Sequence, residues 1–342
     1  MAVLHPDAGL AARQRQSQLT KPAGSLGRLE ALACWLAERS GQVCPPLPQP
    51  GIAVFAGDHG VAADGVSAFP SAVTAEMVKN FTRGGAAINV LARAIAAPLE
   101  VVDVGVASPL PAELPIVHAR VRAGTGNLRT EAAMSLDECR QALAIGRASA
   151  RRLHAQGVTL LIAGDMGIGN TTASACLVCA FTGATPEDIV GLGTGIDDAR
   201  RAHKVAVVGE ALARAQAAGA HDGESWLAQV GGLEIAAMAG LLLEAAALGI
   251  PALLDGFIAT AAALAARAIE PAAADWWLAS HRSQEQGHLR ALAALGLTPL
   301  IDLELRLGEG SGAALAVPLI QMAVRLHNEM ATFAEAGVSG AA

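Results

Sequence analysis

Apolar and polar positions alternate along the chain in blocks that favour strands followed by helices. Buried strands are predicted where short runs of apolar and β-branched residues occur, at 51–56, 99–104, 158–163 and 251–254, with a shorter run at 116–121. Helices are predicted where apolar residues recur every three or four positions, at 71–96, 136–156, 198–218, 233–248, 257–269 and 283–295. This alternation predicts an α/β fold with a doubly wound, mostly parallel sheet and helices on both faces.

The two ends of the chain follow a different pattern, with helices and no strands. Residues 1–20 are polar and predicted to be helical, and the spacing of Leu29, Leu32 and Leu36 predicts an amphipathic helix up to about residue 40. A proline-rich stretch at 44–50 reads as a linker. With a final apolar helix after residue 312, we expect a small helical subdomain made of 1–45 and 313–342. The large α/β domain would then span 51–312.

Composition narrows the class of protein. The chain has 342 residues, a net charge of −7 and no cluster of Lys and Arg, which argues against binding to nucleic acid. Its first residues lack the apolar core of a signal peptide, and the longest uncharged run, 166–186, is interrupted by polar residues, so no membrane span is expected. Five cysteines without a disulfide-like spacing fit a reducing cytosol, so we expect a cytoplasmic protein.

The sequence R-L-G-E-G-S-G at 306–312 is the strongest candidate for chemistry. Its three glycines allow a sharp turn and bring backbone N–H groups close to a ligand. Arg306 supplies a fixed cation, and Ser311 is predicted to cap the helix that follows. Glu309 is either a solvated residue of an ordinary turn or a catalytic base that points into a cleft.

Two further glycine-rich loops each precede a predicted helix. The loop at 164–172 follows a strand, so it can approach a phosphate or ribose, or simply form a tight turn. Its spacing fits neither the dinucleotide fingerprint nor the P-loop. The loop at 191–198 precedes Lys204, which is either a phosphate contact or an exposed helix lysine. The adjacent acids Asp197 and Asp198 follow a Thr-Gly pair instead of preceding it, which argues against the metal-dependent use of a pyrophosphorylated sugar.

Acidic and histidine residues follow the predicted strands. Asp58, Asp165 and Asp255 would lie at the carboxyl ends of parallel strands, where such sheets bind ligands. His281 and His288 have a spacing that could place both on one helical face, but Ser283 between them resembles a helix cap, so we predict no zinc site. For His59 we expect a hydrogen-bonded structural role, and for the C-x-x-C at 176–179 buried packing.

Several motifs together resemble the nicotinate-nucleotide–dimethylbenzimidazole phosphoribosyltransferase family. The matching segments appear in family order across nearly the whole chain. They are K-P-x-G-S-L-G-R-L-E at 21–30, D-H-G-V at 58–61, T-R-G at 82–84, the loop at 165–172, G-G-L-E at 231–234, L-D-G-F at 254–257, S-H at 280–281 and the segment 306–315.

The resemblance implies a two-part subunit, a homodimer and a specific reaction. In that family, 5-phosphoribose moves from nicotinate mononucleotide to 5,6-dimethylbenzimidazole with inversion, giving α-ribazole 5′-phosphate and nicotinate for the nucleotide loop of cobalamin. The family's catalytic base corresponds to Glu309, and Asp165 occupies the position of a second acidic group that is Glu in some relatives. No cofactor and no metal are implied.

The resemblance also implies which residues meet the substrates. The donor's phosphate and ribose would contact Gly167, Gly169, Asn170, Lys204, Ser283, Arg306 and Gly308, and Met166 would also bind substrate. The acceptor base would contact Phe69, Met77 and Leu307. Phe69 and Met77 replace polar residues of some relatives, which leaves substituted purines and phenols open as acceptors. Two other functions remain open, a nucleotide-binding regulator without turnover and an NAD-dependent oxidoreductase, although the latter lacks its fingerprint.

Overall fold

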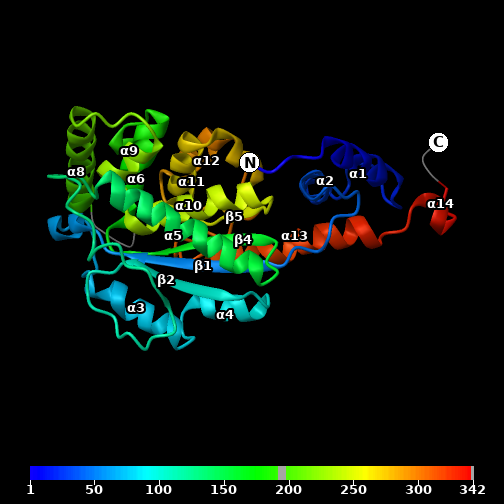
Figure 1. The fold of residues 1–342 in the computed structure, drawn as a ribbon. Coiled ribbons are helices and arrows are strands. Elements are labelled where there is room, and N and C mark those ends of the chain that lie inside the picture. Colours follow the sequence, from blue (N-terminus) through cyan, green and yellow to red (C-terminus); the bar gives the residue numbers. More distant parts are fainter. Residues whose placement is uncertain (192–197, 340–342) are drawn as a thin grey trace.

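A six-stranded parallel sheet forms the centre of the molecule (Figure 1). The computed structural model describes residues 1–191 and 198–339. The strands are β1 (Pro50–Gly57), β2 (Leu99–Gly105), β3 (Val117–His118), β4 (Leu160–Met166), β5 (Ala252–Leu254) and β6 (Trp277–Ala279). Their spatial order is β3-β2-β1-β4-β5-β6, so the chain winds outward in two directions from the β1–β4 pair. The predicted α/β, doubly wound class is therefore confirmed.

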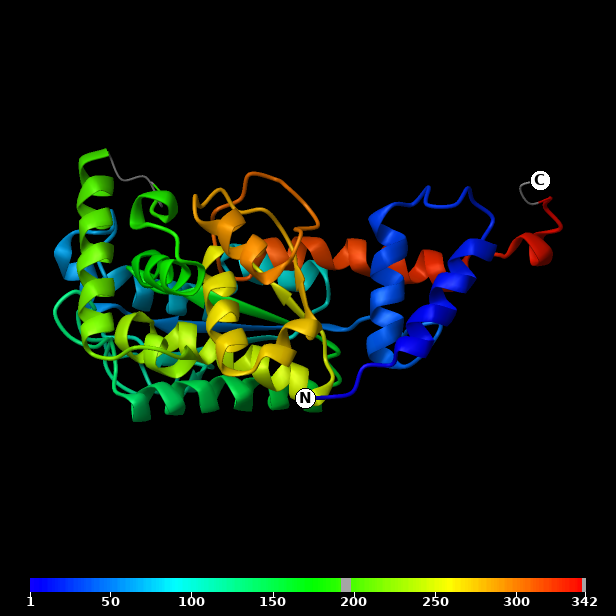
Figure 2. The ribbon, with the colours of Figure 1, turned by 90° about the horizontal axis from the view of Figure 1, so that it is seen from above.

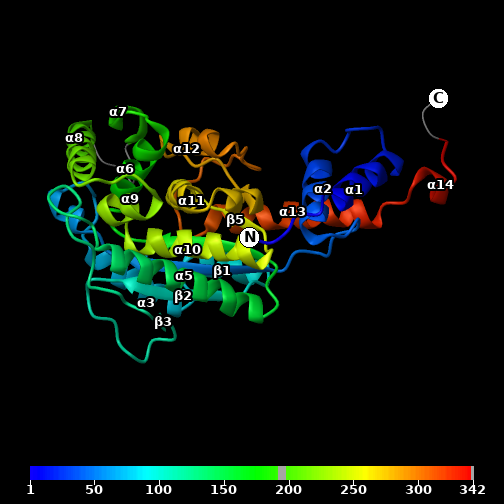
Figure 3. The ribbon, with the colours of Figure 1, turned by 45° about the horizontal axis from the view of Figure 1, so that its top comes forward.

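Helices cover both faces of this sheet (Figures 1 and 3). One face carries α5 (Leu136–Ala155), α10 (Leu233–Leu248) and α11 (Phe257–Ile269), with α6 (Asn170–Thr182), α7 (Pro186–Ile189), α8 (Asp198–Ala217), α9 (Gly223–Val230) and α12 (His288–Leu295) outside them. The opposite face carries α3 (Ala72–Thr82), α4 (Ala87–Ala94) and α13 (Ser311–Glu329). Short 3-10 turns lie at Gly60–Asp64 and Pro271–Trp276.

The alternation of side chains along β1 explains the two cores. Ile52 and Val54 pack on the face of α13, whereas Ala53 and Phe55 pack on the face of α10, and all four are fully buried. A strand covered on both faces must be apolar throughout, as the sequence of β1 is.

Glycines allow α5 and α10 to approach each other closely. A Cβ at Gly146 would lie 1.7 Å from the carbonyl oxygen of Ala237, and one at Gly240 would lie 2.0 Å from that of Leu143. Helix α10 is apolar around most of its circumference and is buried along its first fourteen residues. This tight packing fixes α10, and with it Glu234 at its first turn, against the sheet.

Helices from the N-terminal and C-terminal segments pack together at one end of the molecule (Figure 2). Helices α1 (Pro6–Gln18) and α2 (Arg28–Ser40) pack together, and α2 also packs against α13. Arg15 donates hydrogen bonds to the carbonyl oxygens of His327 (2.9 Å) and Asn328 (3.1 Å), and the short α14 (Phe333–Ala336) follows. The division into a terminal helical subdomain and an α/β domain stays a prediction.

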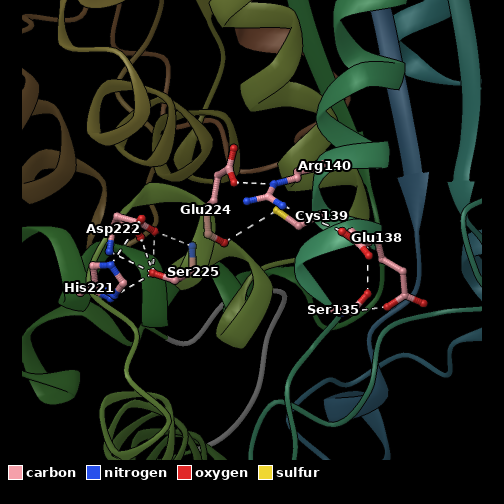
Figure 4. A network of polar contacts seen from close by, with 9 residues as sticks. Ser135, Glu138, Cys139, Arg140, His221, Asp222, Glu224 and Ser225 are labelled. Carbon is pink, nitrogen blue, oxygen red and sulfur yellow. Dashed lines mark hydrogen bonds and ion pairs between the residues drawn. The ribbon is translucent and has the colours of Figure 1, made fainter.

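Capping side chains tie α5 to α9 on the outer surface (Figure 4). Ser135 and Glu138 form a capping box at the start of α5, and the Asp222 carboxylate accepts the Ser225 N–H (2.8 Å) at the start of α9. Arg140 then donates from Nε to Glu224 Oε2 at 2.9 Å, which links the two helix starts.

Two predicted helices differ from the structure. The helix expected over 71–96 is interrupted, because Gly84 adopts φ 75° and the chain ends α3 there before it starts α4. The helix expected over 283–295 begins only at His288. Strand β6 and helix α9 were not predicted. No helix in the described residues is long and apolar enough to cross a membrane.

Candidate active site

A pocket of about 230 Å³ lies at the carboxyl ends of β4, β5 and β6. It is lined by Met77, Asp165, Met166, Gly167, Ile168, Asn170, Thr171, Gly256, Phe257, Ile258, His281, Ser283, Glu285, Arg306, Leu307, Gly308 and Glu309. A larger pocket of about 400 Å³ lies between α1 and α2, but it contains none of the predicted site residues. The strand-end pocket is therefore the candidate active site.

Most of the predicted site residues come together in this pocket. Those that line it are Glu309, Asp165, Met166, Gly167, Asn170, Ser283, Arg306, Gly308, Met77 and Leu307. Three others do not line it. Gly169 is the residue before α6, Lys204 lies buried behind the lining, and Phe69 is 49% exposed in the loop before α3.

Sequence reasoning missed part of the lining. Gly256, Phe257 and Ile258 belong to the L-D-G-F segment after β5, and His281 belongs to the S-H pair after β6. Both segments were recognised as motifs, and their position after a parallel strand was the signal that could have placed them in the site. Glu285 carried no such signal, because the predicted helix over 283–295 hid the loop that presents it.

Backbone geometry places Glu309 in the pocket. Gly308, Glu309 and Gly310 adopt φ values of 88°, 64° and 87°, so three consecutive residues are left-handed. The Glu309 side chain is only 5% exposed, and its Oε2 accepts the N–H of Ile88 at 3.3 Å in the first turn of α4. A carboxylate at a helix N-terminus is favourably placed. This contact exists because the chain breaks between α3 and α4.

Asp255 holds the start of α13, the helix that follows Glu309. Its Oδ2 accepts the Gly310 N–H at 3.2 Å and its Oδ1 accepts the Ala313 N–H at 2.9 Å, while His281 Nε2 lies 3.6 Å from Oδ1. The predicted cap Ser311 is wrong, since Gly310 is the capping position and the Ser311 hydroxyl has no partner in the described part of the chain. An aspartate from a distant strand performs the capping instead.

Buried carboxylates gather around the pocket with few cations beside them. Burial, together with the charges of Asp255, Glu234 and Glu309, raises the pKa of Asp165 well above its usual range, although Asn170 Nδ2 donates to it at 2.9 Å. Burial also raises the pKa of Glu309. The hydrogen bond from the Ile88 N–H lowers this pKa and the Asp255 charge raises it, and both effects are smaller than that of burial. A carboxylate with a raised pKa accepts a proton more readily, which suits a general base near neutral pH.

Lys204 is buried, so it is not the exposed helix lysine that its spacing also allowed. Its Nζ donates to Thr171 Oγ1 at 2.7 Å, and Thr171 lines the pocket in the first turn of α6. Burial lowers the pKa of Lys204, whereas the charge of Glu285 opposes that change. Burial raises the pKa of Glu285 despite the charges of Lys204 and Arg306. Lys204, Glu285 and Arg306 thus interact through their charges in this part of the site.

The histidines support the loops and form no metal centre within 1–191 and 198–339. His288 Nδ1 accepts the Ser283 N–H at 2.9 Å and its Nε2 lies 3.0 Å from Thr260 Oγ1, so it fixes the pocket loop. Burial, and then the charge of His281, lower the pKa of His288 to about 3. The expected structural role of His59 agrees with its buried contact to Glu234, where Nε2 and Oε1 are 2.7 Å apart. Most of the predicted loop at 191–198 lies outside the described residues.

Comparisons with known proteins give one consistent result. The family model described as phosphoribosyltransferase matches residues 1–338. The chain is 62% identical over 330 residues to a nicotinate-nucleotide–dimethylbenzimidazole phosphoribosyltransferase of Chromobacterium violaceum, covering 96% of this chain and 95% of that protein. It is 53% identical to the enzyme of the same name from Pseudomonas aeruginosa, covering 96% and 93%. The crystal structure of CobT from Thermus thermophilus superposes with a TM-score of 0.95 at 48% identity, covering 98% of this chain and all of that one.

Proposed function

The chain belongs to the phosphoribosyltransferase family that its sequence matches, and we propose that it transfers 5-phosphoribose from nicotinate mononucleotide to 5,6-dimethylbenzimidazole. It is a pentosyltransferase enzyme, not the oxidoreductase or the binding-only regulator considered above. The proposed products are α-ribazole 5′-phosphate, formed with inversion, and nicotinate. The names of its relatives support a role in making the lower-ligand nucleotide of cobalamin.

The buried Glu309 carboxylate is the observation that carries this proposal. One ring nitrogen of the neutral base forms a bond to the anomeric carbon, and the bond from that carbon to the nicotinate nitrogen breaks. The electron pair of the broken bond stays on the pyridine nitrogen, which loses its positive charge. The proton on the other benzimidazole nitrogen must leave, and Glu309, held in the pocket with a raised pKa, accepts it.

Another set of residues in the same pocket suits the phosphorylated sugar. Asn170 is the first residue of α6 and Gly167 lies in the loop just before it, near a helix N-terminus whose backbone N–H groups favour an anion. Arg306 lines the same pocket, and Lys204 adds positive charge behind Thr171. Met77, Met166 and Leu307 supply apolar contacts for a flat aromatic acceptor. We propose that these groups align donor and acceptor, which is the main remaining source of rate.

Assembly and location belong to the same proposal. The family resemblance supports a homodimer that works in the cytoplasm on these two small substrates. Measurement of the molar mass in solution at working concentration tests the dimer, because a monomer of 34.5 kDa and its dimer differ twofold in mass.

A pair of glutamate variants tests the assignment. We expect the wild-type protein to form α-ribazole 5′-phosphate from the two substrates without added metal, measured by chromatography and mass. Glu309→Gln should reduce kcat by about a hundredfold to ten-thousandfold, because the amide cannot accept the proton. Glu304→Gln is the matched control, since Glu304 lies in the same segment, also with positive φ, but is exposed.

Three outcomes separate the parts of this proposal. Product from the wild type, and loss only in Glu309→Gln, supports both the reaction and the base. Product that Glu309→Gln leaves undiminished contradicts the base assignment alone. No product with 5,6-dimethylbenzimidazole, but turnover with a purine or a phenol, would replace the acceptor and keep the transfer of phosphoribose.

A further inference from the structure

Asp255 is a buried carboxylate that contacts the loop carrying Glu309. It follows β5, is 1% exposed, and accepts N–H groups from Gly310 and Ala313 on either side of the first residues of α13. Glu309 directly precedes Gly310. The side chain of Asp255 therefore fixes the residues that follow the proposed base without itself lining the pocket in the structure.

We propose that Asp255 is a positioning residue for the phosphoribosyl transfer, and that it acts by holding the Glu309 carboxylate in place through the first turn of α13. The inference rests on the proposed role of Glu309. Two observations set Asp255 apart from an ordinary helix cap. Both of its oxygens are used on the same turn, and that turn begins at the last of three consecutive left-handed residues, Gly308, Glu309 and Gly310.

His281 completes this arrangement from the neighbouring strand. Its Nε2 lies 3.6 Å from Asp255 Oδ1, and its ring occupies the space that a side chain at position 312 would need. A Cβ at Gly312 would lie 2.0 Å from His281 Cδ2. The start of α13 is thus packed between Asp255 and His281, so it has little freedom to shift.

The charge of Asp255 adds a second effect on Glu309. The charged or polar groups around Glu309 are Asp165 on β4, Asp255 after β5, His281 after β6, Arg306 in its own loop, Glu285, and the Ile88 N–H on α4. After burial itself, the Asp255 charge is one of the causes that raise the pKa of Glu309. Removal of this charge should lower that pKa, so Glu309 should stay ionised, and the enzyme active, to lower pH.

Two substitutions separate position from charge. Asp255→Asn keeps the size but loses the charge and offers an N–H₂ to one of the two N–H donors. We expect kcat to fall about tenfold to a hundredfold, and the acidic limb of the kcat/KM profile to move to lower pH by about half a unit or more. Asp255→Glu keeps the charge in a longer side chain, so kcat should fall while the acidic limb stays where it is in the wild type.

Asp103→Asn is the matched control. Asp103 is also a buried strand-end carboxylate, and its Oδ1 accepts the Val106 N–H at 2.9 Å, but it does not line the pocket. Asp103→Asn should leave the pH profile unchanged. A profile that moves equally in both Asn variants, or in neither, would overturn the inference.

A readout independent of turnover keeps this inference separate from the proposed reaction. Carbon-13 labelling of glutamate carboxyl groups, with Glu309 assigned by comparison with Glu309→Gln, gives the titration of Glu309 in the folded protein. We expect a lower midpoint in Asp255→Asn than in the wild type and an unchanged one in Asp103→Asn. If the wild type makes no product, the proposed function fails, but this titration still decides the role of Asp255. An unchanged midpoint contradicts it.

Discussion

Buried acidic residues occur in two kinds of surroundings in this molecule. Between α5 and α10, Glu244 accepts hydrogen bonds from Arg151 Nε (2.7 Å) and Arg147 Nη1 (3.2 Å). In the pocket, Glu309 Oε2 accepts the Ile88 N–H at 3.3 Å, and no ion pair found among the described residues includes Glu309. Burial raises the pKa of Glu244, but the two arginines reverse this effect and leave it below its usual value. The pKa of Glu309 is raised.

The difference shows how the same side chain serves structure or chemistry. A carboxylate paired with arginines is a weak base whose charge is already neutralised, and it holds α5 against α10. A carboxylate restrained by the backbone alone keeps its capacity to accept a proton. Reactive groups are commonly found in such unfavourable surroundings, where the fold supplies the missing stability.

Gly164→Ala should remove the backbone restraint on Glu309. A methyl group at this position of β4 would lie 2.3 Å from the carbonyl oxygen of Glu309, so the loop must shift. We expect kcat to fall about a hundredfold or more, because small displacements of a reacting group are costly. Gly209→Ala on α8 is the control, since among the described residues the nearest atom to its methyl would be Pro186 Cγ at 4.0 Å. Full kcat in Gly164→Ala would show that Glu309 needs no such restraint.

Asp165→Asn should make the folded state more stable near neutral pH. Asp165 has a raised pKa when folded, so between about pH 4 and that raised value the folded state binds more protons than the unfolded state. In that window the free energy of unfolding of the wild type falls as pH rises. The variant lacks this loss, so its Tm at pH 7 should be higher by about 1–3 °C. The gain should disappear at pH 4, where unfolded Asp is itself half protonated. Equal Tm values throughout the scan would contradict it.

Glu244→Gln should have the smallest effect of the three variants, and it should lower stability where Asp165→Asn raises it. Glu244 has a lowered pKa when folded, so its contribution to stability is present above the usual pKa of glutamate and is lost as pH falls through the lower folded value. Since its arginine partners are partly exposed, we expect the free energy of unfolding at pH 7 to fall by about 0.5–1 kcal/mol with kcat unchanged. Urea unfolding measures this change, with Glu329→Gln in an exposed pair as the weaker control.

The sequence predicted the parts of the molecule that local patterns control. The strands read as apolar runs because they are covered on both faces, and the position of Asp165 at a strand end followed from that pattern. Glycines around Glu309 indicated a loop of unusual backbone, as the positive φ values show. Most of the pocket lining expected from the family resemblance does meet in one place.

The remainder depended on contacts between distant segments. The Gly84-Gly85 pair is a local signal for a break that the helix predicted over 71–96 ignored, but no local pattern could show that the new N-terminus at Ile88 meets Glu309. A local rule assigned the cap of α13 to Ser311, whereas Asp255, more than fifty residues earlier, supplies it. The short β6 has too few residues for a periodic signal.

Helix α13 connects the pocket mechanically to the ends of the chain. Its 19 residues span about 28 Å, and Glu309 lies just before its first turn. Arg15 donates a hydrogen bond near its far end, and α2 packs against it. A tilt of α1 and α2 relative to the sheet would therefore move α13 and displace Glu309. Pro318 lies inside this helix and has no N–H to donate to the preceding turn, so α13 is held together by one backbone hydrogen bond fewer at that point.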